Sequence, residues 1–443
     1  KVYFDKVVSF SWYLSCVIYL RINTPNKMIH QKRREELLSM LGRDAVVIVS
    51  TNSEQKRNSD VTYPFRPDSN FWYLTGFTEP DAIAVFSKES YVMFLRPKDE
   101  TKEIWNGIRL GVALAPETLL VDQAYDIDTF FNNIDSFTQK RSVIYFDAPG
   151  SGGWKDNSST NIHNQRIHSL FEGSLKPLNP CISEMRLIKD KEEVKNMQYA
   201  ADLASEAHMS AMRVASPGLY EHNVASVFDS QFTNGNSEHS YPPIVASGEN
   251  ACILHYNENN QELQDGDLLL IDAGCEINGY ASDITRTFPI NGKFSEAQKE
   301  IYGIVLSAQK SAIDSIKPGV SCNKPHETAC QIITDGLIKL GIMKSPEDLT
   351  KFYMHGTGHW LGLDVHDVGV KLINDEFREF KSGMVTTVEP GIYIRRDDKI
   401  ESKYWGIGVR IEDDVLVTEA GNHVLSKKAV KDITEIEYLM SQR

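Results

Sequence analysis

The sequence predicts a two-domain protein whose first domain has an α/β fold. A chain of 443 residues is longer than one hydrophobic core usually organises, so two domains are expected. After Met28, helical patterns alternate with short apolar runs at Ala45–Ser50 and Tyr91–Leu95, which is typical of α/β structure. A polar stretch rich in glycine and serine, Gly150–Asn161, precedes the Pro180 region, where we place the domain boundary.

Residues 28–182 therefore form the predicted N-terminal domain and residues 183–443 the second domain. In the second domain, Lys189–Val214 has helical spacing of its apolar residues and stops at a Pro-Gly pair. A second helix begins at the capping box formed by Ser295 and Gln298 and also ends at a Pro-Gly pair. Two helices with this shared ending hint at a duplicated half-domain.

The first 27 residues differ from the rest of the chain. Val7–Leu20 is an apolar run flanked by basic residues, and it is too short to span a bilayer comfortably. The segment could be an organelle-targeting signal. It could also be an upstream extension outside the working protein, because an ordinary charged amphipathic stretch begins at Met28. No stable membrane insertion is expected.

Composition and charge exclude several classes of protein. With 41% hydrophobic and 24% charged residues the chain is in the ordinary globular range, so disorder is excluded. The formal charge of -14 disfavours nucleic acid as a partner and suits a cation-binding protein. The cysteines form neither C-x-x-C pairs nor a dense framework, so we expect free thiols, a reducing cytoplasmic compartment and no thiolate zinc site.

The clearest chemical motif is a hairpin that carries two aspartates. Asn278-Gly279 is a strong signal for a tight turn. Counting outward from this turn, Gly274 faces Asp283, and Asp272 lies diagonally from Asp283 on the same face. Diagonal neighbours are roughly 7 to 8 Å apart, and two carboxylates so placed repel each other unless a cation lies between them. The alternative is an ordinary hairpin with a polar face.

A second motif, Phe352–Asp367, contains His355, His359 and His366. The spacing of the first two histidines resembles that of zinc-protease helices, but no glutamate follows His355 and two glycines oppose a helix. We therefore predict a loop or strand. Any one of these histidines could be a structural residue, whereas three together favour a functional site.

Two further strands bring in acidic residues. The strand that begins at Met384 ends at Glu389. In a strand over Gly406–Asp414, Arg410 and Glu412 would share one face. Without other information the simplest interpretation of that pair is a surface ion pair.

These residues together predict a mainly oxygen metal site, made of Asp272, Asp283, His359, Glu389 and Glu412. This mixture suits Mn²⁺ and related divalent ions, and bridging carboxylates imply two ions. Two such ions can share a hydroxide and polarise a carbonyl group. That chemistry hydrolyses amides.

The order of these five residues resembles the metal-ligand set of the pita-bread metallopeptidases. The surrounding motifs look specifically like aminopeptidase P, and the resemblance runs from about Met28 to the C-terminus. The motifs that carry it are Ser247–Asn259, the aspartate hairpin, Phe352–Asp367, Val388–Tyr393, Arg410–Asp414 and, in the N-terminal half, Tyr63–Phe77 and Glu103–Gly111.

The resemblance implies a fold and an activity. The C-terminal domain would be an α+β pita-bread domain with pseudo-twofold halves and a curved, mainly antiparallel sheet, and the N-terminal domain would be non-catalytic. The chain would be a Xaa-Pro aminopeptidase, which uses a hydroxide bridging two metal ions to hydrolyse the bond before proline. Its partners would be peptides with proline at the second position.

The resemblance also implies residue roles. Asp283 would hold both metals, Asp272 mainly one and His359 the other, with Glu389 and Glu412 completing the site. Glu389 would also handle a proton, and the catalytic set includes His255 and His366, which would steady the substrate carbonyl and the oxyanion. His355, Tyr393 and Arg410 are assigned to the same set as support. Trp105 would reach a neighbouring subunit of a homodimer or homotetramer.

Three other functions stay open on the sequence. A Xaa-Pro dipeptidase (prolidase) would share the metal ligands, and a creatinase-type, metal-independent hydrolase or a non-catalytic binding module can use the same fold. Retention of all five ligand positions favours an enzyme. The location would be cytoplasmic, or organellar if residues 1–27 act as a targeting segment.

Overall fold

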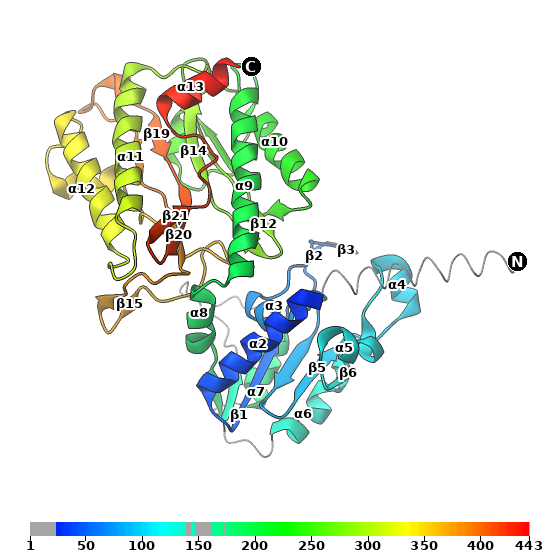
Figure 1. Cartoon of the computed structure of the whole chain (residues 1–443). Helices are drawn as coiled ribbons and strands as arrows, with labels where there is room; N and C mark the ends of the chain where they lie inside the picture. Colours follow the sequence, from blue (N-terminus) through cyan, green and yellow to red (C-terminus); the bar gives the residue numbers. More distant parts are fainter. Residues whose placement is uncertain (1–23, 139–142, 147–161, 172–173, 443) are drawn as a thin grey trace, which may run out of the picture. The chain divides into compact units, whose positions relative to one another are not determined.

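The computed structural model describes residues 24–138, 143–146, 162–171 and 174–442 (Figure 1). The predictions for residues 1–27 and for the linker at Gly150–Asn161 lie wholly or largely outside these ranges. The chain divides into two compact units, Lys1–Met185 and Arg186–Arg443. None of the described helices is long and apolar enough to cross a membrane.

The first unit is built on a mixed sheet. Its strand order is β6-β5-β4-β1-β7-β8, in which β4 pairs antiparallel with both β1 and β5, and the other neighbours pair parallel. The strands of this sheet are β1 (Ala45–Ser50), β4 (Ile83–Phe86), β5 (Tyr91–Leu95), β6 (Gln123–Asp126), β7 (Val143–Phe146) and β8 (Leu175–Pro177). The apolar runs that predicted β1 and β5 are fully buried in it.

The other elements of this part are helices and a small hairpin that precede, connect or follow these strands along the chain. They are α2 (Thr24–Leu41), β2 (Lys56–Asn58), β3 (Val61–Thr62), α3 (Ser69–Thr75), α4 (Glu100–Asn106), α5 (Gly111–Leu119), η1 (Ile127–Thr129), α6 (Phe130–Thr138), α7 (Ile162–Leu170) and α8 (Asn179–Leu187). Phe94 and Phe130, from β5 and α6, pack edge to face in the core. The predicted α/β character of this part is confirmed.

The second unit contains two pairs of packed helices, which supply its duplicated halves. Helix α9 packs on α10, and α11 packs on α12. Figure 1 shows one pair on either side of the strands β14 (Thr285–Pro289) and β19 (Ile407–Arg410). The helices are α9 (Lys191–Val214), α10 (Glu221–Asn234), α11 (Glu296–Asp314), α12 (Lys324–Lys339) and α13 (Ile433–Ser441), with the short turns η2 (Gly248–Cys252), η3 (Pro346–Lys351) and η4 (Ser402–Tyr404). The predicted capping box of Ser295 and Gln298 opens α11.

All described strand pairings of the second unit are antiparallel. The main sheets have the orders β10-β11-β14 and β17-β20-β21, with β13-β12-β9, β18-β19 and β15-β16 beside them. The strands are β9 (Glu238–His239), β10 (Ile244–Ser247), β11 (Leu268–Asp272), β12 (Cys275–Ile277), β13 (Tyr280–Ala281), β14 (Thr285–Pro289), β15 (Leu372–Ile373), β16 (Glu376–Phe377), β17 (Val385–Val388), β18 (Gly391–Ile394), β19 (Ile407–Arg410), β20 (Asp413–Thr418) and β21 (Gly421–Val424).

One strand prediction was wrong. Residues Gly406–Asp414 do not form one strand, because the chain leaves its pairing with β18 after Arg410 and joins β17 from Asp413 onward. Glu412 therefore lies in the connection between β19 and β20. The surface ion-pair interpretation also fails, since Arg410 and Glu412 are 4% and 2% exposed.

Candidate metal centre

Two aspartates lie at the point where the central hairpin changes sheets. Asp272 is the last residue of β11, and its strand partner is Thr285 in β14. Tyr241 places its hydroxyl 2.5 Å from Oδ1 of Asp272 and 2.6 Å from Oδ1 of Asp283. A tyrosine hydroxyl has one proton to donate, so it cannot satisfy two ionised carboxylates at once. Arg410 pairs with Asp272 at 2.6 Å, so one guanidinium and one shared hydroxyl face two buried carboxylates and the further acids beside them.

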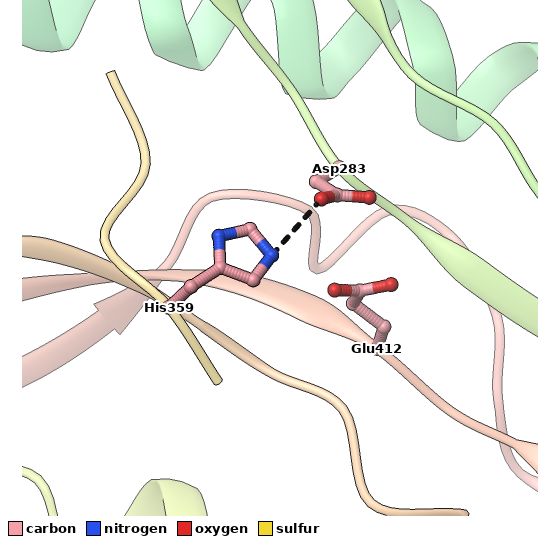
Figure 2. Close-up of side chains that lie close together, drawn as sticks. All are labelled: Asp283, His359 and Glu412. Carbon is pink, nitrogen blue, oxygen red and sulfur yellow. Dashed lines mark ion pairs between the residues drawn. The ribbon is translucent and has the colours of Figure 1, made fainter. Parts of the chain in front are cut away.

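His359 and Glu412 complete a compact cluster with Asp283. One ligand atom from each of these three residues lies within 4.8 Å of the others. Figure 2 shows the imidazole ring turned toward both carboxylates, with Nε2 of His359 3.3 Å from Oδ2 of Asp283. Glu412 is anchored to β14, because its backbone N–H donates to the Thr285 carbonyl and its Oε2 accepts from the Thr285 hydroxyl at 2.7 Å.

The tautomer of His359 is fixed by its second ring nitrogen. Nδ1 lies 3.0 Å from the carbonyl oxygen of Trp360, which can only accept, so Nδ1 carries the hydrogen. In the neutral ring the lone pair of Nε2 then points at Asp283 and at Glu389, whose Oε1 is 3.7 Å away. A lone pair directed at two carboxylates needs a cation between them. A backbone carbonyl that orients the ring in this way is a usual feature of metal-binding histidines.

The titration behaviour of the cluster reflects the same crowding of negative charge. Burial raises the pKa of Glu389 to about 7, although the charges of His359 and Arg410 oppose the shift. Burial and then the neighbouring carboxylates raise the pKa of Glu412 well above its usual range. Burial disfavours the charged form of His359 and so lowers its pKa. The hydrogen bond between His359 and Asp283 and the charge of Glu389 outweigh burial and raise the pKa of His359 to about 9. Without a metal, protons take the place of cations in this site.

The five predicted ligand residues therefore lie together, and the set fits divalent ions. Four carboxylates and one imidazole give oxygen donors with a single nitrogen, which suits Mn²⁺ and similar ions better than soft-ligand metals. Their like charges, with one tyrosine hydroxyl shared between two of them, are the structural reason to expect cations.

A chain of hydrogen bonds runs from Asp272 to His355. Arg410 donates from Nη2 to Oδ2 of Asp272 at 2.6 Å and from Nη1 to the Tyr393 hydroxyl at 3.1 Å. The Tyr393 hydroxyl lies 2.8 Å from Nε2 of His355, whose Nδ1 faces the Gly356 carbonyl. Because that carbonyl accepts the Nδ1 hydrogen, the tyrosine is the donor to Nε2. Burial lowers the pKa of His355 to about 4 and keeps it neutral.

His255 and His366 occupy the more open side of the site. Both are exposed, unlike the buried Asp283 and Glu412. The ring centroids of His359 and His366 are 4.2 Å apart. Burial, then the charge of His359, lowers the pKa of His366, and the charge of His255 adds to this shift. The charge of His255 also contributes to lowering the pKa of His355.

Tyr241 was missed by reasoning from the sequence. It lies just before β10, whose residue Ile244 pairs with Asp272. The pairing of β10 with β11 carries the preceding residues over the end of β11. No local sequence pattern around Tyr241 predicts the pairing of β10 with β11, because a long loop separates these two strands.

Comparison with known proteins agrees with this geometry. Residues 195–419 match metallopeptidase family M24, and residues 30–145 match the aminopeptidase P N-terminal domain. The chain is 44% identical to a Xaa-Pro aminopeptidase of Haemophilus influenzae, over 93% of this chain and 96% of that protein. The structure resembles Pseudomonas aeruginosa aminopeptidase PepP, with a TM-score of 0.88, 40% identity and coverage of 94% of this chain and 98% of the other.

A zinc-substituted Escherichia coli aminopeptidase P in complex with product matches equally well, with a TM-score of 0.88, 40% identity and the same coverage of both chains. The predicted combination of an α/β domain with a pita-bread domain is therefore confirmed, and so is the dependence on divalent metal. The chain belongs to the aminopeptidase P family of Xaa-Pro aminopeptidases, within metallopeptidase family M24.

Proposed function

We propose that this chain is a Xaa-Pro aminopeptidase that removes the first residue of a peptide when proline follows it. The observation that carries the proposal is the convergence of four carboxylates and His359 on one site, in a chain similar to a Xaa-Pro aminopeptidase over 93% of its length. The residues that we assign to the metals are Asp272, Asp283, His359, Glu389 and Glu412.

We assign two divalent ions to these residues and Mn²⁺ as the preferred metal, because oxygen donors dominate the set. When bound, such ions lower the pKa of a water molecule and polarise the carbonyl group of the substrate. The free α-amino group of the peptide would bind near the metals. That position explains why the first residue is removed and internal bonds are spared.

Glu389 is suited to move a proton during hydrolysis. Its oxygens lie 3.7 Å from His359 and 3.8 Å from His355, and the side chain is partly exposed at 19%. A carboxylate in this position can take a proton from the attacking water and return it to the proline nitrogen as that nitrogen leaves.

His255 and His366 are suited to hold the substrate. They are exposed beside the buried ligand residues, and partial desolvation, then the charge of His359, lowers the pKa of His366 and so favours its neutral form. A neutral imidazole offers one N–H, which can donate to the scissile carbonyl and more strongly to the oxyanion that forms from it.

The test is release of arginine from Arg-Pro-Pro by the purified protein with Mn²⁺. Asp283→Asn should abolish turnover, whereas Asp229→Asn, a change at an exposed aspartate of α10, should leave turnover intact. Cleavage of Arg-Pro without cleavage of Arg-Pro-Pro would indicate a prolidase instead. A folded wild-type protein that binds peptide but is inactive with every divalent metal would indicate a binding module.

We also propose that the protein forms a homodimer or homotetramer. Ile104 and Trp105 of α4 are 81% and 84% exposed, and Ile108 is 64% exposed. Large apolar side chains clustered on one short segment of a surface mark an interaction site. Sedimentation should give a mass of two or four chains, and Trp105→Ser should shift it toward one chain.

We propose a cytoplasmic location, because the described cysteines form no disulfide bonds. The cysteines among the described residues are free thiols, as expected for a reducing compartment. Fluorescent fusions with and without residues 1–27 should both remain in the cytoplasm, and an organellar signal that depends on those residues would favour the targeting alternative.

A further inference from the structure

The carboxylate of Glu221 gathers a set of hydrogen-bond donors at the start of α10. The residue is 0% exposed. Its Oε1 accepts from the backbone N–H and the hydroxyl of Ser247, at 2.8 and 2.7 Å, and from the Asn250 amide at 3.1 Å. Its Oε2 accepts from the Tyr256 hydroxyl at 2.7 Å and from the backbone N–H of Gln261 at 3.0 Å. Every one of these partners is a neutral donor.

These donors span one segment of the chain, which carries His255. Tyr256, the immediate neighbour of His255, is 5% exposed and is held by Glu221, whereas His255 is exposed. Adjacent residues of this segment thus differ in burial, with the Tyr256 side chain inside the protein and the His255 side chain exposed. Tyr256 packs in one buried cluster with Ile244, the strand partner of Asp272, and with Tyr393, whose hydroxyl lies 2.8 Å from Nε2 of His355, so this segment lies beside the metal centre.

The segment is also held elsewhere, so loss of Glu221 need not unfold it. The side-chain oxygen of Asn259 accepts from the Val245 backbone N–H at 2.8 Å, and its amide donates to the Pro243 carbonyl at 2.8 Å. These bonds fix the end of the segment to the strand β10. They do not involve Tyr256 or the residues around His255.

We propose that Glu221 is a positioning residue for His255, acting through the Tyr256 hydroxyl and the donors of Ser247, Asn250 and Gln261. Its single buried carboxylate sets the path of the segment and hence the direction in which His255 meets the substrate carbonyl. This inference rests on the proposed aminopeptidase function. Misplacement of a substrate-holding group by about 1 Å can cost roughly a hundredfold in rate, so the effect of such an anchor is measurable.

The decisive experiment is a double-mutant cycle with Tyr256→Phe and His255→Ala. Tyr256→Phe removes one hydroxyl and leaves the ring, and we expect kcat for Arg-Pro-Pro to fall roughly tenfold with little change in KM, because one anchoring hydrogen bond is lost. In the His255→Ala background the same change should have no further effect. An equal tenfold loss in both backgrounds would overturn the proposal, because it would show that Tyr256 acts without His255.

A matched control separates this role from general stability. Tyr302 of α11 is also buried, and its hydroxyl donates to the Lys431 carbonyl at 2.7 Å, away from the His255 segment. Tyr302→Phe should leave kcat unchanged. A loss in this variant as large as that of Tyr256→Phe would mean that any buried tyrosine hydroxyl matters equally, and would count against a specific role.

Hydrogen exchange supplies a measurement that does not depend on activity. Glu221→Gln replaces an acceptor by an amide N–H₂ that faces other donors, so exchange should accelerate in residues 247–261 while α11 stays protected. Unchanged exchange in that segment would overturn the inference even in an active enzyme. Accelerated exchange in a protein whose wild type shows no peptidase activity would instead refute the proposed function and leave the anchor in place.

Discussion

Arg410 donates a hydrogen bond from Nη2 to Oδ2 of Asp272 at 2.6 Å, and the two side chains are 5% and 14% exposed. The same guanidinium holds the Tyr393 hydroxyl through Nη1 and the Thr285 hydroxyl through Nε, each at 3.1 Å. One planar cation therefore fixes a predicted metal ligand, a strand of the central sheet and the tyrosine that supports His355. A flexible ammonium could not keep these three directions at once.

Arg410→Lys should consequently weaken catalysis although it keeps the charge. Loss of a group that orients a metal ligand typically costs 10- to 100-fold in metal affinity or activity, and we expect a fall of about this size in kcat for Arg-Pro-Pro. Steady-state kinetics and metal titration of the variant check it. An unchanged kcat with unchanged Mn²⁺ affinity would show that Asp272 does not depend on Arg410.

Metal binding should stabilise the fold, because the cluster of carboxylates is destabilising without cations. At Mn²⁺ a hundredfold above its dissociation constant, the gain is about 2.7 kcal/mol, which is a rise in Tm of roughly 5 to 10 °C for a unit of this size. Calorimetry with Mn²⁺ and with a chelator measures this difference. Asp283→Asn should melt at a temperature that Mn²⁺ does not change, and an equal rise in that variant would mean that the ions bind elsewhere.

The aspartate hairpin was accessible from the sequence because local turn chemistry fixes its register. Asn278 and Gly279 have φ values of 50° and 82°, the left-handed geometry that an Asn-Gly turn predicts. Ile277 pairs with Tyr280 as predicted, and the same count leads to the observed pairing of Asp272 with Thr285. Two carboxylates could thus be assigned to one site by counting from a turn.

The rest of the site depends on pairings between distant segments, which leave no local pattern. Glu412 was assigned to a strand, yet it lies in a connection held by Thr285. Tyr241 and Glu221 act through contacts with residues far along the chain, and nothing in their neighbouring sequence marks them. Reasoning from the sequence selected acidic and histidine residues that the structure brings together, and the structure adds residues that contact them.

Buried His208 should make the protein less stable as the pH falls. Its Nε2 lies 3.0 Å from the Ala273 carbonyl, and burial, aided by the charge of Arg286, lowers its pKa to about 3. The unfolded chain binds this proton near pH 6.5, so the contribution of neutral His208 is full above that pH and is lost as the pH falls below it. The loss between pH 7 and pH 5 is about 2 kcal/mol.

Urea unfolding of the wild type and of His208→Gln at both pH values checks this prediction. Glutamine keeps an N–H donor for the Ala273 carbonyl and cannot titrate, so the variant should lose about 2 kcal/mol less than the wild type between pH 7 and pH 5. An identical loss in the two proteins would assign the acid sensitivity to other groups.

Gly274 should be intolerant of any side chain, because it lies between the two aspartates where the hairpin changes sheets. A Cβ at this position would meet the backbone oxygen of Ser282 at 1.9 Å and the Ser240 hydroxyl at 2.9 Å. A backbone contact this short cannot be relieved by rotating a side chain, so Gly274→Ala should cost at least about 3 kcal/mol of unfolding free energy. It should also weaken Mn²⁺ binding, because Asp272 and Asp283 flank the displaced backbone.

Gly303→Ala is the matched control, since a Cβ at that position in α11 meets nothing within 4 Å. Alanine is favoured over glycine inside a helix, so this variant should gain up to about 1 kcal/mol. Urea unfolding and Mn²⁺ titration of both variants measure the contrast. If Gly274→Ala were as stable as the control and bound Mn²⁺ normally, the spacing of the two aspartates would not depend on the close approach of backbone at Gly274.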